Sequence, residues 1–385
     1  FCSFEVGGFP YRIAEILNRH GIEAYYISLA RDASGHNSTR FHFGETNAPW
    51  DLSGGFARRG VKLLKEIKTR YHVTHCFATG GKSYLLKQAG IDYRYWSYGS
   101  DLDQVCFSGF WPSNYPVWKR FLVYPYFWAR LRPEARESIR QAESVMIAPY
   151  QLELLHAVAP GKSMFFLPHF IKTGDYRSLV RKKEESRKII CDRIGAKRFL
   201  FSSVRHFWAG RHGAAADYKG NEIALRGFDA YLHGSKAYDT KLVLVAKGPD
   251  VEESKTLARE LGIDENVMWV GEMRRDELEQ YYQGASVCLG QFGTPVLTFA
   301  ALEPLAYATA CVSYFADGGT AVPFYRRLPP IKNTNKPEEI AGLIQGILQT
   351  GSSETGRESH EWLREHCSEE RFVSAFVEVF EGKGK

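Results

Sequence analysis

The sequence predicts an α/β protein made of two doubly wound, Rossmann-like domains with parallel sheets. Three observations support this prediction: a chain of 385 residues, short apolar segments that alternate with amphipathic helical patterns, and no tandem repeat of about 20–50 residues. The length is sufficient for two domains of about 150–190 residues each. Strands that alternate with helices of about 10 residues are typical of parallel sheets, because the crossover between parallel strands is usually a helix.

The N-terminal half begins with a strand–helix–strand unit. Residues 1–5 are predicted to form a strand, residues 10–20 a helix with an apolar stripe, and residues 25–29 the next strand. Gly7 and Gly8 separate the first strand from the helix, and glycine lets the backbone approach a ligand closely. The later elements of this half are predicted as helices at 60–71, 133–141 and 150–156 and strands at 74–77 and 144–148.

Residues 107–132 differ from the rest of the chain in composition. Tryptophan, tyrosine and phenylalanine are interleaved there with lysine and arginine, and the stretch contains no acidic residue. Aromatic and cationic side chains together suit the headgroup region of a bilayer, so peripheral contact with a membrane is one interpretation. The other is a loop and helix packed on the first domain. Aromatic rings also bind sugars, so the stretch could instead contact an acceptor glycan.

The boundary between the two predicted domains lies in a charge-rich segment. The first domain is assigned to residues 1–170 and a linker to residues 171–196, whose run RKKEESRK at 181–188 is interpreted as a solvated face. The second domain is assigned to residues 197–358, and a pair of terminal helices to residues 359–385.

The second domain is predicted to continue the alternation of strands and helices. Strands are predicted at 199–204, 241–246, 267–270, 286–291 and 310–314, and helices at 221–234, 252–261, 276–283 and 298–307. In parallel sheets of this kind, ligands bind beyond the carboxyl ends of the strands, next to helix N-termini that suit phosphate. Glu303 is the one carboxylate in the apolar helix 298–307, and an unpaired buried charge is costly. We therefore expect Glu303 to face that crevice, with a solvated helix edge as the alternative.

Three motifs of this domain resemble the donor-binding core of the family-4 retaining glycosyltransferases, which have the GT-B fold of two facing Rossmann-like domains. Residues 266–271 (NVMWVG) match a strand motif that ends in glycine, and residues 276–285 match the helix motif D/E-L-x-x-Y-Y-x-x-A. Glu303 matches the second acidic residue of an E-x7-E motif, and Pro295 stands where the first is expected. The resemblance also implies that the terminal helices at 359–385 pack against the first domain.

The resemblance implies a role for each matching position. Arg205 and Lys219 correspond to the cations that bind the donor diphosphate, and fixed cations stabilise a departing nucleoside diphosphate without a metal. Glu303 corresponds to the residue that holds the nucleotide ribose, and these three residues form the expected catalytic set. The expected donor-binding residues are Gly7, Gly8, Val270, Gly271, Pro295, Thr298 and Phe299, and the acceptor side is assigned to Tyr98 and Asp101.

The resemblance further implies a hexosyltransferase-type glycosyltransferase that moves a sugar from a UDP- or GDP-linked donor to a glycan or lipid-linked acceptor. Retention of configuration is expected, with no metal and no cofactor, in the synthesis of cell-surface polysaccharide or glycoconjugate. Residues 101–103 spell D-x-D, a metal-binding motif of another glycosyltransferase fold, but the GT-B class holds its diphosphate without a metal. Two alternatives stay open: an epimerase or hydrolase that acts on the nucleotide sugar alone, and a non-catalytic nucleotide-sugar-binding scaffold, which Pro295 favours.

Composition predicts a folded, cytoplasmic protein. The chain is 44% hydrophobic and 24% charged, which argues against extended disorder. The net charge of +6 suits phosphorylated ligands or an anionic membrane and is too small to indicate nucleic acid. Seven cysteines lack a C-x-x-C spacing, which favours reduced cytosolic thiols. We find no run of 18 apolar residues and no signal-peptide pattern, so neither a membrane span nor export is expected. Contact with the inner face of the membrane would use residues 107–132.

Overall fold

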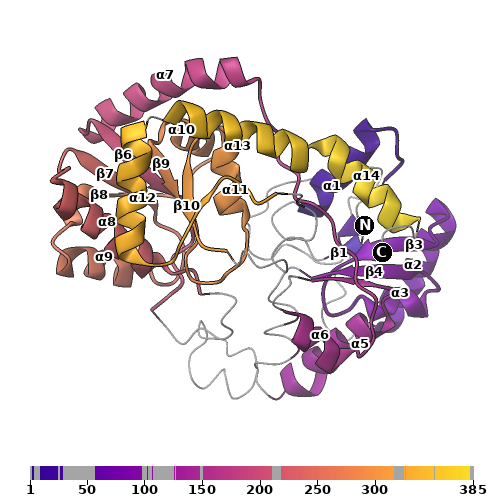
Figure 1. Cartoon of the computed structure of the whole chain (residues 1–385). Coiled ribbons are helices and arrows are strands. Elements are labelled where there is room, and N and C mark those ends of the chain that lie inside the picture. The colour runs from indigo at the N-terminus through magenta and orange to yellow at the C-terminus, as the bar shows by residue number, and fades with distance from the viewer. Residues whose placement is uncertain are drawn as a thin grey trace. The chain divides into compact units, whose positions relative to one another are not determined.

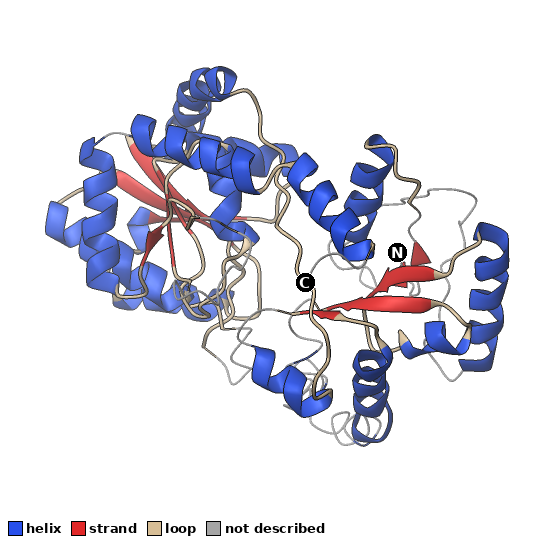
Figure 2. Ribbon diagram, turned by 45° about the vertical axis from the view of Figure 1, so that its right-hand side comes forward, coloured by secondary structure: helices blue, strands red, loops and turns tan. Residues whose placement is uncertain are grey.

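The chain forms two compact units in the computed structural model (Figure 1). Unit 1 comprises Phe1–Leu167 and Val373–Lys385, and unit 2 comprises Pro168–Phe372. In each unit, parallel strands lie in the middle with helices around them (Figure 2). The structure describes residues 2–3, 9–24, 27–28, 57–97, 102, 106, 125, 127–147, 151–209, 218–315, 325, 327–350 and 352–381. Within these ranges, every helix is too short or too polar to span a bilayer.

Unit 1 contains a five-stranded parallel sheet in the order β2-β1-β3-β4-β5. Its strands are β1 (Cys2–Ser3), β2 (Ile27–Ser28), β3 (His75–Ala78), β4 (Asp92–Trp96) and β5 (Val145–Met146). Its helices include α1 (Phe9–Arg19), α2 (Ala57–Tyr71), α3 (Tyr84–Gln88), the π-helix η2 (Phe127–Leu131), α5 (Arg132–Gln141) and α6 (Leu152–Val158). Tyr93 and Tyr95 of β4 are fully buried in its core. The predicted parallel α/β arrangement is confirmed here.

Unit 2 contains a six-stranded parallel sheet in the order β11-β10-β9-β6-β7-β8. Its strands are β6 (Arg198–Ser202), β7 (Thr240–Val245), β8 (Val267–Val270), β9 (Val287–Leu289), β10 (Cys311–Ser313) and β11 (Lys332–Asn333). The helices are α7 (Tyr176–Ile194), α8 (Asn221–Ser235), α9 (Val251–Glu260), the 3-10 turn η5 (Asp264–Asn266), α10 (Arg275–Gly284), α11 (Phe299–Ala306), α12 (Pro337–Thr350), α13 (Ser352–His366) and α14 (Glu369–Phe380), whose last residues belong to unit 1.

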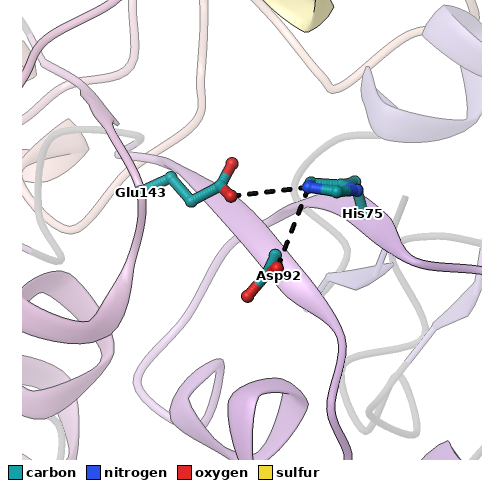
Figure 3. Close-up of side chains that lie close together, drawn as sticks. All are labelled: His75, Asp92 and Glu143. Carbon is teal, nitrogen blue, oxygen red and sulfur yellow. Dashed lines mark ion pairs between the residues drawn. The ribbon is translucent and has the colours of Figure 1, made fainter.

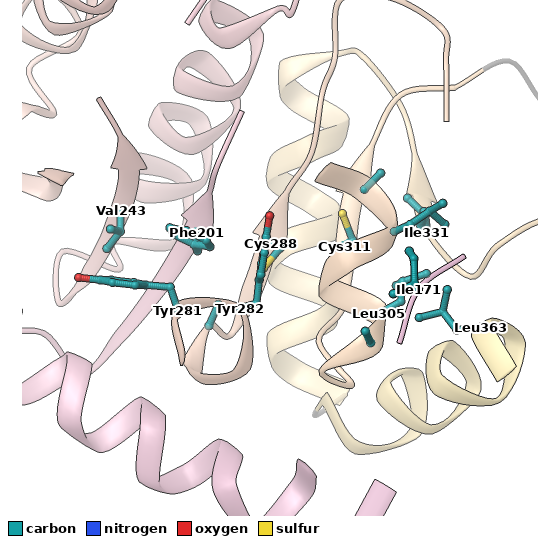
Figure 4. Close-up of a cluster of buried hydrophobic side chains, with 14 of the residues drawn as sticks. Ile171, Phe201, Val243, Tyr281, Tyr282, Cys288, Leu305, Cys311, Ile331 and Leu363 are labelled. Carbon is teal, nitrogen blue, oxygen red and sulfur yellow. The ribbon is translucent and has the colours of Figure 1, made fainter. Parts of the chain in front are cut away.

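Helices cover both faces of the unit 2 sheet, because successive strand residues point to opposite sides. Phe201 lies in a cluster with residues of α7, α10, α11 and α13, among them Tyr281 and Leu305 (Figure 4). Its neighbour Leu200 lies in a second cluster with residues of α8, α9 and α12, among them Phe228. Helices α8 and α11 therefore cover opposite faces of the sheet.

The C-terminal helices divide between the two units. Helix α13 packs against α11 in unit 2, whereas residues 373–380 of α14 belong to unit 1. Within unit 1, the ring of Phe77 in β3 lies 4.6 Å from that of Phe376 and 6.2 Å from that of Phe380, centroid to centroid. In the segment 359–385, which was expected to pack against the first domain, the contacts with Phe77 come from Phe376 and Phe380 in its second helix.

The charged run at 181–188 forms the middle of helix α7 and has a buried side as well as a solvated one. Asp175 caps this helix by accepting from the amide of Ser178 at 2.8 Å, and Gly195 ends it in the left-handed conformation. Lys183 is buried, and its Nζ donates to Ala308 O at 2.8 Å and to Thr309 Oγ1 at 3.1 Å. The interpretation of this run as a solvated face was wrong for Lys183, because the carbonyls that follow α11 attract a cation.

We expect Lys183→Met to lower the free energy of unfolding by about 2–3 kcal/mol, because two buried acceptors lose a charged donor. Burial lowers the pKa of Lys183 to about 8, against 10.5 for an ordinary lysine. Between these pH values the unfolded state binds more protons, so the stability of the unmodified protein should rise relative to the variant from pH 8 to pH 10.5. Urea unfolding at several pH values measures both effects, with Lys182→Met, an exposed neighbour, as the control. A difference that is small and independent of pH would contradict this role.

Candidate functional site

The strand order of unit 2 places a topological switch point between the carboxyl ends of β6 and β9. From β6 the chain continues through α8 to β7 on one side, and from β9 through α11 to β10 on the other. Helices α8 and α11, which follow β6 and β9, cover opposite faces of the sheet. Ligands of doubly wound sheets bind at such a switch point, so we looked for functional groups there.

The loops that follow β6 and β9 are bonded to each other at this point. The carbonyl of Lys219 accepts from the amides of Phe292 at 3.0 Å and Gly293 at 3.2 Å, and Thr294 Oγ1 donates to Tyr218 O at 2.9 Å. A Cβ atom at Gly293 would lie only 2.3 Å from Tyr218 O, and one at Gly220 only 2.5 Å from Gly293 N. The two glycines thus permit a backbone approach that other residues would prevent. The backbone of Lys219 is therefore held at the switch point.

Arg205 lies just beyond the carboxyl end of β6. The amide of His206 donates to Lys247 O at 2.7 Å, and a Cβ atom at Gly248 would lie 2.2 Å from His206 O. The loops after β6 and β7 therefore touch through their backbones, while the Arg205 side chain is exposed with its guanidinium 5.2 Å from the Phe207 ring. Burial lowers the pKa of His206 to about 4, so His206 adds no positive charge near neutral pH.

The carboxylate of Glu303 is held by two side chains of helix α10. Arg275 Nη1 donates to Oε1 at 2.5 Å and the Tyr282 hydroxyl donates to Oε2 at 3.0 Å. Tyr282 also shares a hydrogen bond of 2.6 Å with Ser203 Oγ, directly after β6. The Glu303 side chain is 18% exposed, and the charge of Arg275 balances that of its carboxylate. The sequence analysis did not predict Arg275 as a partner of Glu303. The available signal was the spacing of Arg275, Glu279 and Tyr282, which places them on one helix face.

The other predicted donor-binding residues in this unit lie on the β8 and β9 loops. Val270 ends β8, and Gly271 follows with no described atom within 4 Å of a Cβ placed on it. Thr298 precedes the first residue of α11, and its buried hydroxyl has no hydrogen-bond partner among the residues described. Phe299 begins α11 and packs edge-on against His169 at 5.0 Å between ring centroids. Pro295 lies half-buried in the loop that leads to this helix.

The predicted residues of unit 1 are placed less completely. Gly7, Gly8, Tyr98 and Asp101 lie outside the described residues. Of the aromatic and cationic stretch 107–132, the structure describes residue 125 and residues 127–132. There Trp128 is 40% exposed, and the Arg132 guanidinium lies 4.0 Å from the centroid of its ring.

One group of described side chains could offer three ligands to a metal ion: His75, Asp92 and Glu143 (Figure 3). His75 Nε2 lies 3.8 Å from Asp92 Oδ2 and 3.5 Å from Glu143 Oε1. Each carboxylate already has a cation, because Lys87 pairs with Asp92 and Arg94 with Glu143 at 3.3 Å. His75 and Asp92 begin β3 and β4, so the group lies at the amino edge of its sheet. The carboxyl edge, where β4 ends shortly before Tyr98, is the opposite edge.

Residues 213–349 match the family described as Glycosyl transferases group 1. This range includes Lys219, Val270, Gly271 and Glu303, whereas Arg205 lies before it. No curated protein matches the chain in sequence.

Solved structures with the same fold cover nearly the whole chain. A glycosyltransferase from Rickettsia africae ESF-5 covers 99% of this chain and 97% of its own, with 13% identity and a TM-score of 0.63. The lipopolysaccharide outer core galactosyltransferase WaaB covers 100% and 99%, with 14% identity and a TM-score of 0.60. HepE from Anabaena, solved with UDP and glucose, covers 99% and 91%, with 11% identity and a TM-score of 0.58. The family match and the fold together identify the chain as a glycosyltransferase of the GT-B fold.

Proposed function

We propose that the protein transfers a sugar from a nucleoside diphosphate donor to an acceptor, and that the donor binds at the switch point of unit 2. One observation carries this proposal. Hydrogen bonds from residues 292–294 to the carbonyls of Tyr218 and Lys219 hold Lys219 beside the loop that leads into α11. A cation and a helix N-terminus at one switch point suit a diphosphate.

Each contact residue has a role that follows from its chemistry. Arg205 and Lys219 bind the diphosphate together with the backbone amides near Thr298 and Phe299 at the start of α11, and they stabilise the charge of the departing nucleotide. Glu303 accepts hydrogen bonds from the ribose hydroxyls. The nucleobase lies against the backbone of Val270 and Gly271, where the space beside Gly271 is open.

The proposed donor is UDP- or GDP-linked, and HepE, which was solved with UDP and glucose, supports this choice. Transfer proceeds with retention, with the leaving phosphate assisting deprotonation of the acceptor, so that neither a metal nor a cofactor takes part. A proline at position 295 in place of an acid changes how the donor sugar is held. The proposed acceptor is a glycan or lipid-linked molecule of cell-surface polysaccharide or glycoconjugate synthesis. Tyr98 and Asp101 are assigned to the acceptor side of the site, and Gly7 and Gly8 to the donor side.

A thermal-shift screen against UDP, GDP, dTDP, ADP and CMP tests the donor class. A ligand that binds the native state raises the melting temperature by mass action, by an amount that grows with its concentration over Kd. We expect UDP or GDP to give the largest shift. No shift with any nucleotide at millimolar concentration would contradict the proposed function and favour a scaffold that has lost its donor site.

We also propose that unit 1 contacts an anionic membrane surface through residues 107–132. The net charge of the chain lies entirely in unit 1, which has 22 Lys and Arg against 16 Asp and Glu, whereas unit 2 has 28 of each. Helix α2 adds exposed Lys62, Lys65 and Arg70 to this unit. The protein should sediment with phosphatidylglycerol vesicles, and replacing Trp111, Trp118 and Trp128 with serine should reduce the bound fraction. Failure of the unmodified protein to sediment would contradict this proposal.

A further inference from the structure

Helix α10 presents Arg275 and Tyr282 to the carboxylate of Glu303 in α11, and Glu279 of the same helix contacts Arg275. Arg275, Glu279 and Tyr282 are separated by four and three residues, so they project from the same face of the helix. Arg275 uses both parts of its guanidinium: Nη1 donates to Glu303 Oε1 at 2.5 Å, and Nε donates to Glu279 Oε1 at 3.0 Å. Glu279 therefore steadies the arginine that in turn holds Glu303.

Tyr282 fixes the second oxygen of Glu303 and connects it to the loop after β6. Its ring stacks on Tyr307 with centroids 6.0 Å apart, and its carbonyl accepts from Thr309 Oγ1 at 2.8 Å. Burial, and then the nearby Glu303, raise the pKa of Tyr282 well above its ordinary value, so the phenol keeps its proton. The hydroxyl can therefore donate to Glu303 Oε2 and accept from Ser203 Oγ.

These contacts determine what Glu303 can still bind. A carboxylate has about four lone-pair directions, and Arg275 and Tyr282 occupy one on each oxygen. The remaining directions accept hydrogen bonds and cannot donate them. Because the arginine already balances the charge, a neutral donor group such as a sugar hydroxyl is a better partner than a further cation.

We propose that Arg275 and Tyr282 are positioning residues that fix the Glu303 carboxylate and thereby make the site select ribonucleotide over deoxyribonucleotide donors. This inference rests on the proposed function, because it requires a nucleotide whose ribose faces Glu303. Arg275 and Tyr282 act through Glu303 and need not touch the donor. Their loss should weaken discrimination between riboses more than it weakens the rest of nucleotide binding.

Calorimetric titration of four proteins tests the inference: the unmodified chain, Tyr282→Phe, Arg275→Gln and Arg275→Lys. The probes are UDP or GDP, whichever gives the larger thermal shift, and its 2′-deoxy and 3′-deoxy analogues. The unmodified protein should bind at least one analogue about 10-fold or more weakly, the usual effect of one hydrogen bond to a charged group. The ratio of the Kd of the deoxy analogue to the Kd of the ribonucleotide should fall below about 3-fold in Tyr282→Phe and Arg275→Gln. In Arg275→Lys this ratio should be larger than in Arg275→Gln.

Arg274→Gln is the matched control, because this neighbouring arginine is 86% exposed and pairs only with Asp276 among the ion pairs of the described chain. It should leave the ratio unchanged. A purely structural role would lower the melting temperature of Tyr282→Phe or Arg275→Gln and leave the ratio as it is, which would overturn the inference alone. An unmodified protein that binds both riboses equally would also overturn it. If neither UDP nor GDP binds the unmodified protein, the proposed function fails as well.

Discussion

Replacing both Arg205 and Lys219 with alanine should abolish sugar transfer, with kcat/KM reduced by about 10³-fold or more. A single fixed group that stabilises developing charge is worth about 10²–10³-fold in rate, and the leaving nucleoside diphosphate here would lose two cations. The Arg205 side chain is exposed and that of Lys219 half-buried, so the fold should persist. Release of nucleoside diphosphate from the donor sugar measures the loss, and circular dichroism checks the fold.

Lys255→Ala combined with Lys336→Ala is the control for this loss of two cations. Both lysines form exposed pairs within one helical turn, Lys255 with Glu252 at 2.8 Å and Lys336 with Glu339 at 2.7 Å. Such surface pairs contribute little to stability, and neither lysine is assigned to the donor site. Transfer should therefore be unchanged. Transfer retained by the Arg205 and Lys219 variant would contradict the assignment of the diphosphate site.

Gly293→Ala should destabilise unit 2 by about 2–3 kcal/mol, the range of a forced overlap in a packed region, and remove nucleotide binding. The added Cβ would lie 2.3 Å from Tyr218 O and 2.7 Å from its carbonyl carbon. These are backbone atoms, and the Lys219 carbonyl beside them is held by two amides, so the loops must separate. The melting temperature should fall by roughly 5–10 °C for a unit of this size.

Gly271→Ala makes the same chemical change where space is open and should give the opposite pattern. The melting temperature should be unchanged, because no described atom lies within 4 Å of the added Cβ. Nucleotide binding should still weaken, since the methyl group would stand where the nucleobase is proposed to lie. A Gly293→Ala protein with full stability would contradict the close approach of the two loops. A Gly271→Ala protein with full affinity would remove the nucleobase from this position.

The regular elements of unit 2 follow largely from local sequence. Strand β8 has the predicted bounds 267–270, because an apolar run ends there at glycine. Helix α12 was not predicted, because Gly342 and Gly346 lower its intrinsic helix propensity. The packing of α12 on α8 compensates for this loss: Gly227 of α8 leaves room for Ile340, which would lie 2.7 Å from a Cβ there. That contact joins residues far apart in the chain and has no local signature.

The sequence predicted which motifs form the site and their order along the chain, but not the contacts between them. The sequence indicates Glu303 as an isolated acid in an apolar helix, but its partner Arg275 lies 28 residues earlier, and only the packing of α10 on α11 brings them together. The same holds for Lys183 and the carbonyl of Ala308, which are 125 residues apart. The glycines at 220 and 293 are visible in the sequence, whereas their mutual contact depends on the order of β6 and β9 in the sheet.

Hydrogen exchange measured by mass spectrometry, with and without saturating UDP or GDP, tests the location of the donor most directly. The proposed site predicts slower exchange in the loop after β6, residues 203–208, in residues 218–220, in residues 270–273 and in residues 291–300, which include the start of α11. Exchange in α7 and α12 should stay the same. Protection confined to other segments, or none in these despite a thermal shift, would contradict a donor site at the switch point of unit 2.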